Sequence, residues 1–195
     1  MLKAVNSVVR LKILRGVWIE RVDQQFLTLP APYTSMFLTQ EMLRRFAADP
    51  QNHMRASFLE EALAKGDECY GILDGTRLAS YGWYSTKPSR IDPPCFILRF
   101  RQDYVYMYKG LTHAAYRGQG LHAIGMTLAL RHYLARGYRG LVSYVEVNNF
   151  DSLKSTLRMG YAVFGTLYAM TLFGQTFAHG SRGCERFGFS VEPER

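Results

Sequence analysis

The stretch Tyr116-Arg117-Gly118-Gln119-Gly120-Leu121-His122 joins two segments of different periodicity. Residues 104–112 alternate with period two and predict a strand, whereas residues 121–136 predict a long helix. Glycine lets the backbone turn sharply and come close to a ligand. The first turn of a helix leaves N–H groups without intrahelical partners, and these groups, together with the helix dipole, favour bound phosphate. The stretch therefore predicts a site for a phosphate-bearing ligand.

Two widespread phosphate-binding motifs do not match this turn. A P-loop needs Gly-x-x-x-x-Gly-Lys-Ser/Thr, which the chain lacks. A dinucleotide fold needs Gly-x-Gly-x-x-Gly at the opening of a repeated βαβ unit. Here Gly118-Gln119-Gly120 comes late in the chain, and Ala123 stands at the third glycine position. By itself the turn is a weak signal, because glycines also make tight turns where no ligand binds.

Composition favours one folded domain, whose basic charge suits an anionic ligand, an acidic substrate, nucleic acid or a membrane surface. The chain has 195 residues, 48% of them hydrophobic, and a net charge of +8. The basic residues are scattered, so nucleic-acid binding is not favoured. No apolar run approaches the ~20 residues of a membrane span. We expect residues 1–16 to be an N-terminal extension and residues 17–195 to form the domain.

The cysteines give no sign of a metal or redox centre. Cys69, Cys95 and Cys184 are too widely spaced for such a motif, so no metal is expected. An odd, scattered set of thiols suggests reduced cysteines and a cytoplasmic location.

The remaining pattern alternates strand-like and helical segments. Asp74-Gly75 predicts a hairpin turn, and the prolines in residues 86–94 predict a loop. The predicted helices cover residues 41–48, 54–65, 121–136 and 149–159. The predicted strands cover residues 17–22, 69–73, 78–84, 96–100, 104–112 and 141–147, followed by a hairpin within residues 161–177. The order predicts a mixed α/β fold with one βαβ crossover.

A second motif lies downstream of the glycine turn. Asn149-Phe150-Asp151-Ser152 is followed by the pair Gly160-Tyr161. With the turn, this segment resembles the GNAT superfamily of acyl-CoA-dependent N-acyltransferases. That family carries Gln/Arg-x-x-Gly-x-Gly/Ala after its fourth strand, then Asn-x-x-Ala/Ser, with Gly-Phe/Tyr eleven residues after the Asn. The resemblance covers residues 104–161, and the matching residues are Arg117, Gly120, Asn149, Ser152, Gly160 and Tyr161.

The resemblance implies a fold and a cofactor. The fold is a single GNAT-like domain with a mixed, mostly antiparallel sheet, splayed between its fourth and fifth strands, and helices on both faces. The cofactor is acetyl-CoA or another acyl-CoA. Its pyrophosphate is expected at Gly118, Gln119, Gly120, Leu121, His122 and Ala123, and Arg117 is expected to bind the cofactor beside them. Its pantetheine arm is expected along Gly110, Leu111 and Thr112, with Gly110 as a bulge residue. Asn149 and Ser152 are expected to contact the cofactor as well.

The catalytic residues transfer less directly from the family. His122 stands where the family has glycine or alanine, and Thr156 stands where many members have a tyrosine acid. Tyr144 occupies the position of a glutamate base in some members. We expect Glu146, on the same strand face as Tyr144, to be the base. Tyr144 and Tyr161 are the candidate acids, with Ser155 as a further one; a salt bridge from Glu146 to an arginine is the alternative.

The resemblance implies transfer of an acetyl or longer acyl group to an amine, carried by a small molecule or a peptide. A GNAT-like module that binds acyl-CoA without turnover is the alternative, because the tyrosine is missing at position 156. A homodimer is left open, and the sequence does not identify the acceptor.

Overall fold

The computed structural model describes residues 10–91, 96–172 and 175–193. It contains two compact units, which we name after a helix in each. The α3 unit, named after α3 (Leu121–Ala135), comprises residues 19–87 and 103–142. The α4 unit, named after α4 (Phe150–Arg158), comprises the described residues within 1–18, 88–102 and 143–195. Cys95, and residues 173–174 within the hairpin predicted for residues 161–177, lie outside the described residues.

The strands of the α3 unit are β2 (Thr34–Phe37), β3 (Glu68–Asp74), β4 (Arg77–Ser85), β7 (Tyr104–Thr112) and β8 (Gly140–Glu146). Their order in the sheet is β8-β7-β4-β3-β2. Neighbours are antiparallel except β7 and β8, which are parallel and pair Tyr104–Tyr106 with Gly140–Val142. The mixed α/β class expected from the sequence is confirmed. The last four residues of β8 belong to the α4 unit.

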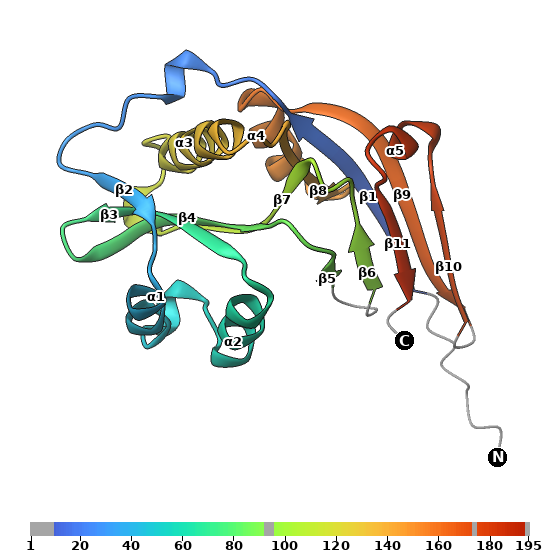
Figure 1. The fold of residues 1–195 in the computed structure, drawn as a ribbon, viewed down its shortest axis with the longest axis horizontal. Coiled ribbons are helices and arrows are strands. Elements are labelled where there is room, and N and C mark those ends of the chain that lie inside the picture. Colours follow the sequence, from blue (N-terminus) through green and yellow to red (C-terminus); the bar gives the residue numbers. More distant parts are fainter. Residues whose placement is uncertain (1–9, 92–95, 173–174, 194–195) are drawn as a thin grey trace. The chain divides into compact units, whose positions relative to one another are not determined.

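Helices cover both faces of this sheet, as expected. Figure 1 shows α3 (Leu121–Ala135) over one face of β3 and β4, with α1 (Gln40–Ala47) and α2 (Ala56–Lys65) under the other. Short 3₁₀ turns stand at η1 (Gln24–Phe26), η2 (Pro50–Asn52) and η3 (Ala114–Tyr116).

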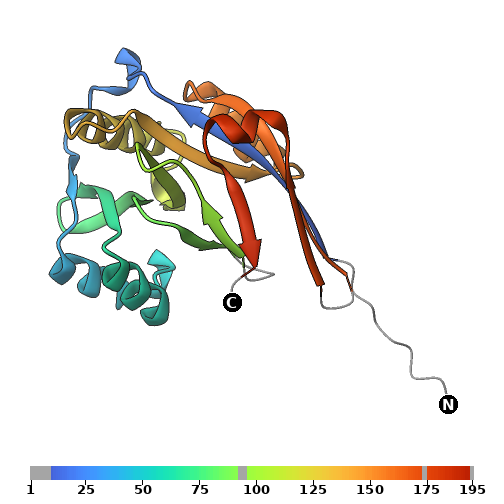
Figure 2. The same ribbon diagram turned by 45° about the vertical axis from the view of Figure 1, so that its right-hand side comes forward.

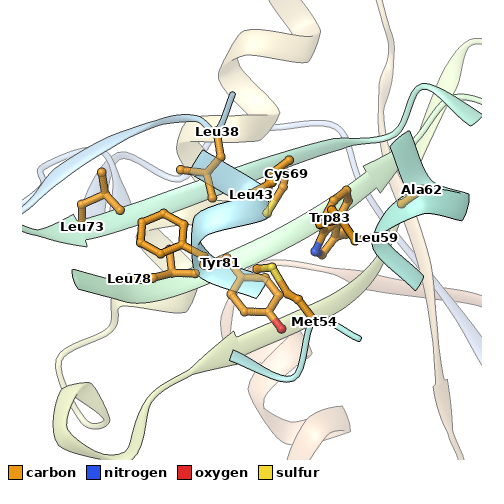
Figure 3. Packing of buried hydrophobic residues seen from close by; sticks show 11 residues of the cluster. Leu38, Leu43, Met54, Leu59, Ala62, Cys69, Leu73, Leu78, Tyr81 and Trp83 are labelled. Atoms are coloured by element: carbon orange, nitrogen blue, oxygen red, sulfur yellow. The ribbon is translucent and has the colours of Figure 1, made fainter. Parts of the chain in front are cut away.

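The core of the α3 unit lies between the sheet and helices α1 and α2. Trp83 is fully buried there, and its ring meets the Phe58 ring edge-on at 5.2 Å between centroids. Burial raises the pKa of the Cys69 thiol well above its usual range, which fits a packing role. Figure 3 shows the cluster, which comprises Leu38, Leu43, Phe46, Met54, Leu59, Ala62, Cys69, Leu73, Leu78, Tyr81 and Trp83.

The α4 unit contains two sets of three antiparallel strands. In one, β9 (Ala162–Leu172) pairs with both β1 (Arg10–Ile19) and β10 (Gln175–Gly180); Figure 2 shows the long β9–β10 pair. In the other, β6 (Phe96–Arg99) pairs with β5 (Ser89–Ile91) and β11 (Ser190–Pro193). Helices α4 (Phe150–Arg158) and α5 (Arg182–Arg186) complete the unit.

Several predicted boundaries were wrong. The first strand covers Arg10–Ile19 rather than residues 17–22, because β1 pairs with β9 from Arg10 onward. It runs across the predicted limit between residues 16 and 17, and the division into an extension and a domain stays a prediction. The short elements β2, β5, α5 and β11 were missed.

Candidate functional site

The glycine turn has the backbone conformation that its sequence predicts. Gly118 and Gly120 have φ angles of +80° and +73°, in the left-handed region that favours glycine. Gly120 is the N-cap of α3, and because it is a glycine it has no side chain that could accept from the first N–H groups of the helix. The ladder of α3 begins with the Ile124 N–H donating to the Gly120 carbonyl at 3.0 Å. The N–H groups of the preceding first-turn residues are therefore outside the helical ladder.

Two side-chain hydrogen bonds link the turn to other parts of the α3 unit. The Tyr33 hydroxyl donates to Gln119 Oε1 at 2.7 Å, and Arg117 Nε donates to the Thr112 carbonyl at 3.3 Å. Arg117 through Gly120 are exposed. A Cβ built on Gly118 or Gly120 would have no described atom within 4 Å other than those of the glycine and its neighbours in the chain. An exposed arginine beside an open helix N-terminus can bind an anion.

His122 is turned toward strand β7. A Cβ added to Gly110 would lie 2.7 Å from His122 Cε1, so glycine at 110 makes room for the imidazole ring. Burial lowers the pKa of His122 below its ordinary value of 6.5. The ring therefore packs as a neutral group against the strand.

The prediction of a β-bulge at Gly110 was wrong. Gly110 pairs with Gly82, and the β4–β7 register shifts two residues earlier, where Tyr84 pairs with Met107 and Trp83 with Lys109. Tyr108 is the extra residue, and its hydroxyl donates to Asp67 Oδ2 at 2.7 Å. The bulge thus turns Tyr108 toward a buried carboxylate.

Leu111 and Thr112 lie at the end of β7, opposite Tyr81 and Ser80 of β4. The Ser80 hydroxyl bonds to the Leu111 carbonyl at 3.0 Å and to Thr112 Oγ1 at 2.8 Å. With Arg117 on the Thr112 carbonyl, these contacts join the end of β7 to the glycine turn.

The candidate base lies in the α4 unit at the end of β8. Glu146 Oε1 is 3.3 Å from Lys12 Nζ of β1, and the Glu146 side chain is 47% exposed. The alternative ion pair was expected with an arginine, whereas its partner is a lysine. Tyr144 is half-buried and two residues from Glu146, so the two share a strand face.

The candidate residues after β8 have mainly local contacts. Asn149 is the N-cap of α4, and its Oδ1 accepts from the Ser152 N–H at 3.1 Å. Thr156 is buried, and its carbonyl accepts the Tyr161 N–H at 3.3 Å. Tyr161 is buried, its hydroxyl has no hydrogen-bond partner among the described residues, and burial raises its pKa. A raised pKa makes the Tyr161 hydroxyl a poorer acid.

Sequence reasoning missed one polar contact in the α3 unit. The buried Asn52 bonds through Oδ1 to His113 Nε2 at 2.8 Å. In the sequence, His113 precedes the glycine turn and could equally be a site residue or a loop histidine, and the residues around Asn52 contain no motif that predicts this contact.

Neither a metal-binding cluster nor a membrane-spanning helix is found in the part of the chain that the structure describes. No cluster of three or more His, Cys, Asp or Glu side chains could hold a metal ion there. No helix among those residues is long and apolar enough to cross a membrane.

Solved structures share the fold at low sequence identity. A GNAT-family protein from Novosphingobium aromaticivorans matches with a TM-score of 0.57 and 16% identity, over 87% of this chain and 68% of its own. A GNAT-family acetyltransferase from Colwellia psychrerythraea matches with a TM-score of 0.55 and 14% identity, over 86% of this chain. This chain spans 58% of that protein, less than two thirds of its length. No curated protein matches the chain.

The family is shown by a sequence comparison that covers both motifs. The model of the Acetyltransferase (GNAT) family matches residues 34–161, which is more than half of the chain. The match includes β7, the glycine turn, α3 and the segment from Asn149 to Tyr161. The GNAT-like fold expected from the sequence is thereby confirmed, and the chain belongs to the acetyltransferase (GNAT) family.

Proposed function

We propose that the protein is an N-acyltransferase that moves an acyl group, in the first instance acetyl, from acyl-CoA to an amine. The observation that carries this proposal is the open N-terminus of α3 behind Gly118 and Gly120, at the position where the family matches. Such a helix start supplies backbone donors to a pyrophosphate without needing a metal ion.

The proposed cofactor residues follow the matched motifs. Arg117 and the backbone of Gly118 through Ala123 would bind the pyrophosphate, because their donors are exposed or lie at the first helical turn. The end of β7, from Gly110 to Thr112, would pair with the pantetheine arm as an added strand does. Asn149 and Ser152 would contact the cofactor from the start of α4.

The proposed reaction is direct transfer. The amine nitrogen bonds to the thioester carbonyl carbon, the carbon–sulfur bond breaks, and coenzyme A leaves as a thiolate. Glu146, whose side chain is 47% exposed at the end of β8, would accept the proton of the attacking amine. Tyr144 would protonate the thiolate, with Tyr161 as the other candidate. The leaving thiol has a pKa of about 8.5, so a strong acid is not required.

The test is incubation of the folded protein with acetyl-CoA and a panel of amines, following release of free thiol. The panel should include small amines, amino acids and peptide N-termini, and longer acyl-CoA donors should be tried in parallel. Amine-dependent thiol release supports the proposal. Absence of release with every amine and every acyl donor would overturn it.

A non-catalytic acyl-CoA-binding module is the second candidate. The observation that favours it is the buried Thr156 at the position of the missing tyrosine acid. Binding of acetyl-CoA measured by calorimetry, with no thiol release from the same preparation, would select this candidate over the enzyme.

A further inference from the structure

A pocket of about 550 Å³ lies in the α3 unit, lined by three separate segments of chain. The end of α1 and η2 contribute Arg45, Phe46 and Asp49; the β3–β4 turn contributes Arg77; and the loop after β7 contributes His113. Pockets of this size hold small-molecule ligands. None of these residues belongs to the proposed cofactor or catalytic sets.

A buried amide fixes the imidazole of this pocket. Asn52 is 3% exposed, and its Nδ2 donates to the Phe46 carbonyl at 2.8 Å. Its Oδ1 is therefore the atom that accepts from His113 Nε2 at 2.8 Å. The Tyr81 hydroxyl donates to the Asn52 carbonyl at 2.7 Å, which holds the residue from the core side. In the neutral imidazole, Nδ1 of His113 is then an acceptor.

The charges around the pocket are of both signs. The Arg45 guanidinium stacks over the Phe46 ring at 4.9 Å, and Arg77 lies on the hairpin turn opposite Asp74. Asp49 Oδ1 accepts the Gln51 N–H at 2.9 Å, and a carboxylate has further acceptor capacity on its second oxygen. Guanidinium groups match carboxylates in geometry, whereas the carboxylate and the imidazole accept from an amine or a hydroxyl.

The inner wall of the pocket is apolar. Phe46 and Leu78 are 6% and 5% exposed and belong to the core cluster of the α3 unit. A ligand with an apolar side chain would bury that side chain against them. The lining thus complements a carboxylate, a hydrogen-bond donor and an apolar group in a single small molecule.

We propose that this pocket binds a free amino acid or hydroxy acid with an apolar side chain. Arg45 and Arg77 bind the carboxylate, Asp49 and His113 accept from the amine or hydroxyl, and Phe46 and Leu78 contact the side chain. The proposal does not depend on acyl transfer, since it concerns binding within one unit and is measured without acyl-CoA.

The test is calorimetric titration of the full chain with L-leucine, L-phenylalanine and 2-hydroxyisocaproate, with L-leucinamide as the probe that lacks a carboxylate. We expect at least one of the three acids to bind, and leucinamide to bind about tenfold more weakly or not at all. Failure of all three acids to bind at millimolar concentration would overturn the proposal, as would equal binding of leucinamide.

The variants locate the binding. The double variant R45Q/R77Q changes two exposed side chains and is expected to weaken acid binding by about tenfold or more. R131Q removes an exposed arginine of α3 that does not line the pocket, and it should bind like the unmodified protein. Retention of full affinity by R45Q/R77Q would refute the proposal, even if the acids bind elsewhere.

Discussion

The candidate residues of the α3 unit and those of the α4 unit offer different chemistry. In the α3 unit they are mostly backbone groups: two left-handed glycines, the first turn of α3 and the end of β7. In the α4 unit they are side chains, and each depends on its surroundings. Glu146 is paired with Lys12, and the Tyr161 hydroxyl is buried without a partner among the described residues.

This difference explains why one set could be predicted more fully than the other. A glycine turn at the start of a helix is specified by adjacent residues, so the same residues define both the conformation and its chemistry. The chemistry of a carboxylate or a phenol depends on partners that the chain supplies from far away in sequence. Substitutions in each unit can therefore show whether its residues contribute to function in the way that their chemistry suggests.

The largest effect is expected from Glu146→Gln. If Glu146 is the base, its neutral replacement should lower kcat by about 100-fold or more, because general bases contribute about 10²–10⁴-fold. The fall in kcat is measured by steady-state kinetics with acetyl-CoA and an amine that the unmodified protein acylates. Glu192→Gln is the matched control, because Glu192 has the same side-chain exposure of 47% and is paired with Arg99 in the same unit. A Glu146→Gln enzyme with unchanged kcat would exclude Glu146 as the base.

The next effect is expected from Gly120→Val. A side chain at a φ of +73° costs about 1–2 kcal/mol and disturbs the donors at the start of α3. We expect acetyl-CoA to bind about 30-fold more weakly, measured by calorimetry. Gly137→Val is the control, since Gly137 has a φ of +90° at the other end of α3 and equally open surroundings. If both variants bind acetyl-CoA equally well, the pyrophosphate does not bind at this turn.

The fold was predictable where the signals are local. The alternation in residues 104–112 and the Asp74-Gly75 pair predicted β7 and the β3–β4 hairpin, both of which are confirmed. The short strands β2 and β11 were missed because their pairing partners define them: β2 pairs with β3, and β11 with β6. Four residues carry too little periodicity to be recognised without those partners.

The candidate site divides in the same way. The conformation of Gly118 and Gly120 follows from residue type and position, and the structure has it. The partner of Glu146 does not follow from residue type and position. Lys12 is far from Glu146 in sequence and approaches it only because β1 pairs within the sheet. The contact between Asn52 and His113 likewise needs the folded chain, since 61 residues separate them.

A smaller effect is expected from Tyr161→Phe. Removing a buried hydroxyl that has no partner among the described residues should raise the free energy of unfolding by about 1 kcal/mol, as measured by urea denaturation. Tyr81→Phe is the opposite control: its hydroxyl donates to the Asn52 carbonyl at 2.7 Å, so the loss should destabilise by about 1 kcal/mol. We expect kcat of Tyr161→Phe to be unchanged; a large fall in kcat would assign the acid role to Tyr161.

The smallest effect concerns the pH dependence that His122 gives to stability. Burial against Gly110 lowers the pKa of the folded imidazole below 6.5, so the unfolded chain binds the proton first as the pH falls. The contribution of His122 to the free energy of unfolding is therefore fully present above about pH 6.5, and it is lost progressively as the pH falls below that value. The titratable side chains lining the same small space are Tyr70, Tyr81 and Tyr84, and tyrosines stay neutral between about pH 5 and 7.

His122→Phe keeps a ring against Gly110 but removes the proton site. Its free energy of unfolding should fall less than that of the unmodified protein between about pH 7 and 5, as measured by urea denaturation at each pH. His53→Phe is the control for the loss of an imidazole, because His53 is exposed and does not line this space. Parallel profiles for His122→Phe and the unmodified protein would mean that the imidazole is not held neutral against β7. His122 would then be available as a cation at the glycine turn, and the α3 unit would use a side chain as well as its backbone to bind an anion.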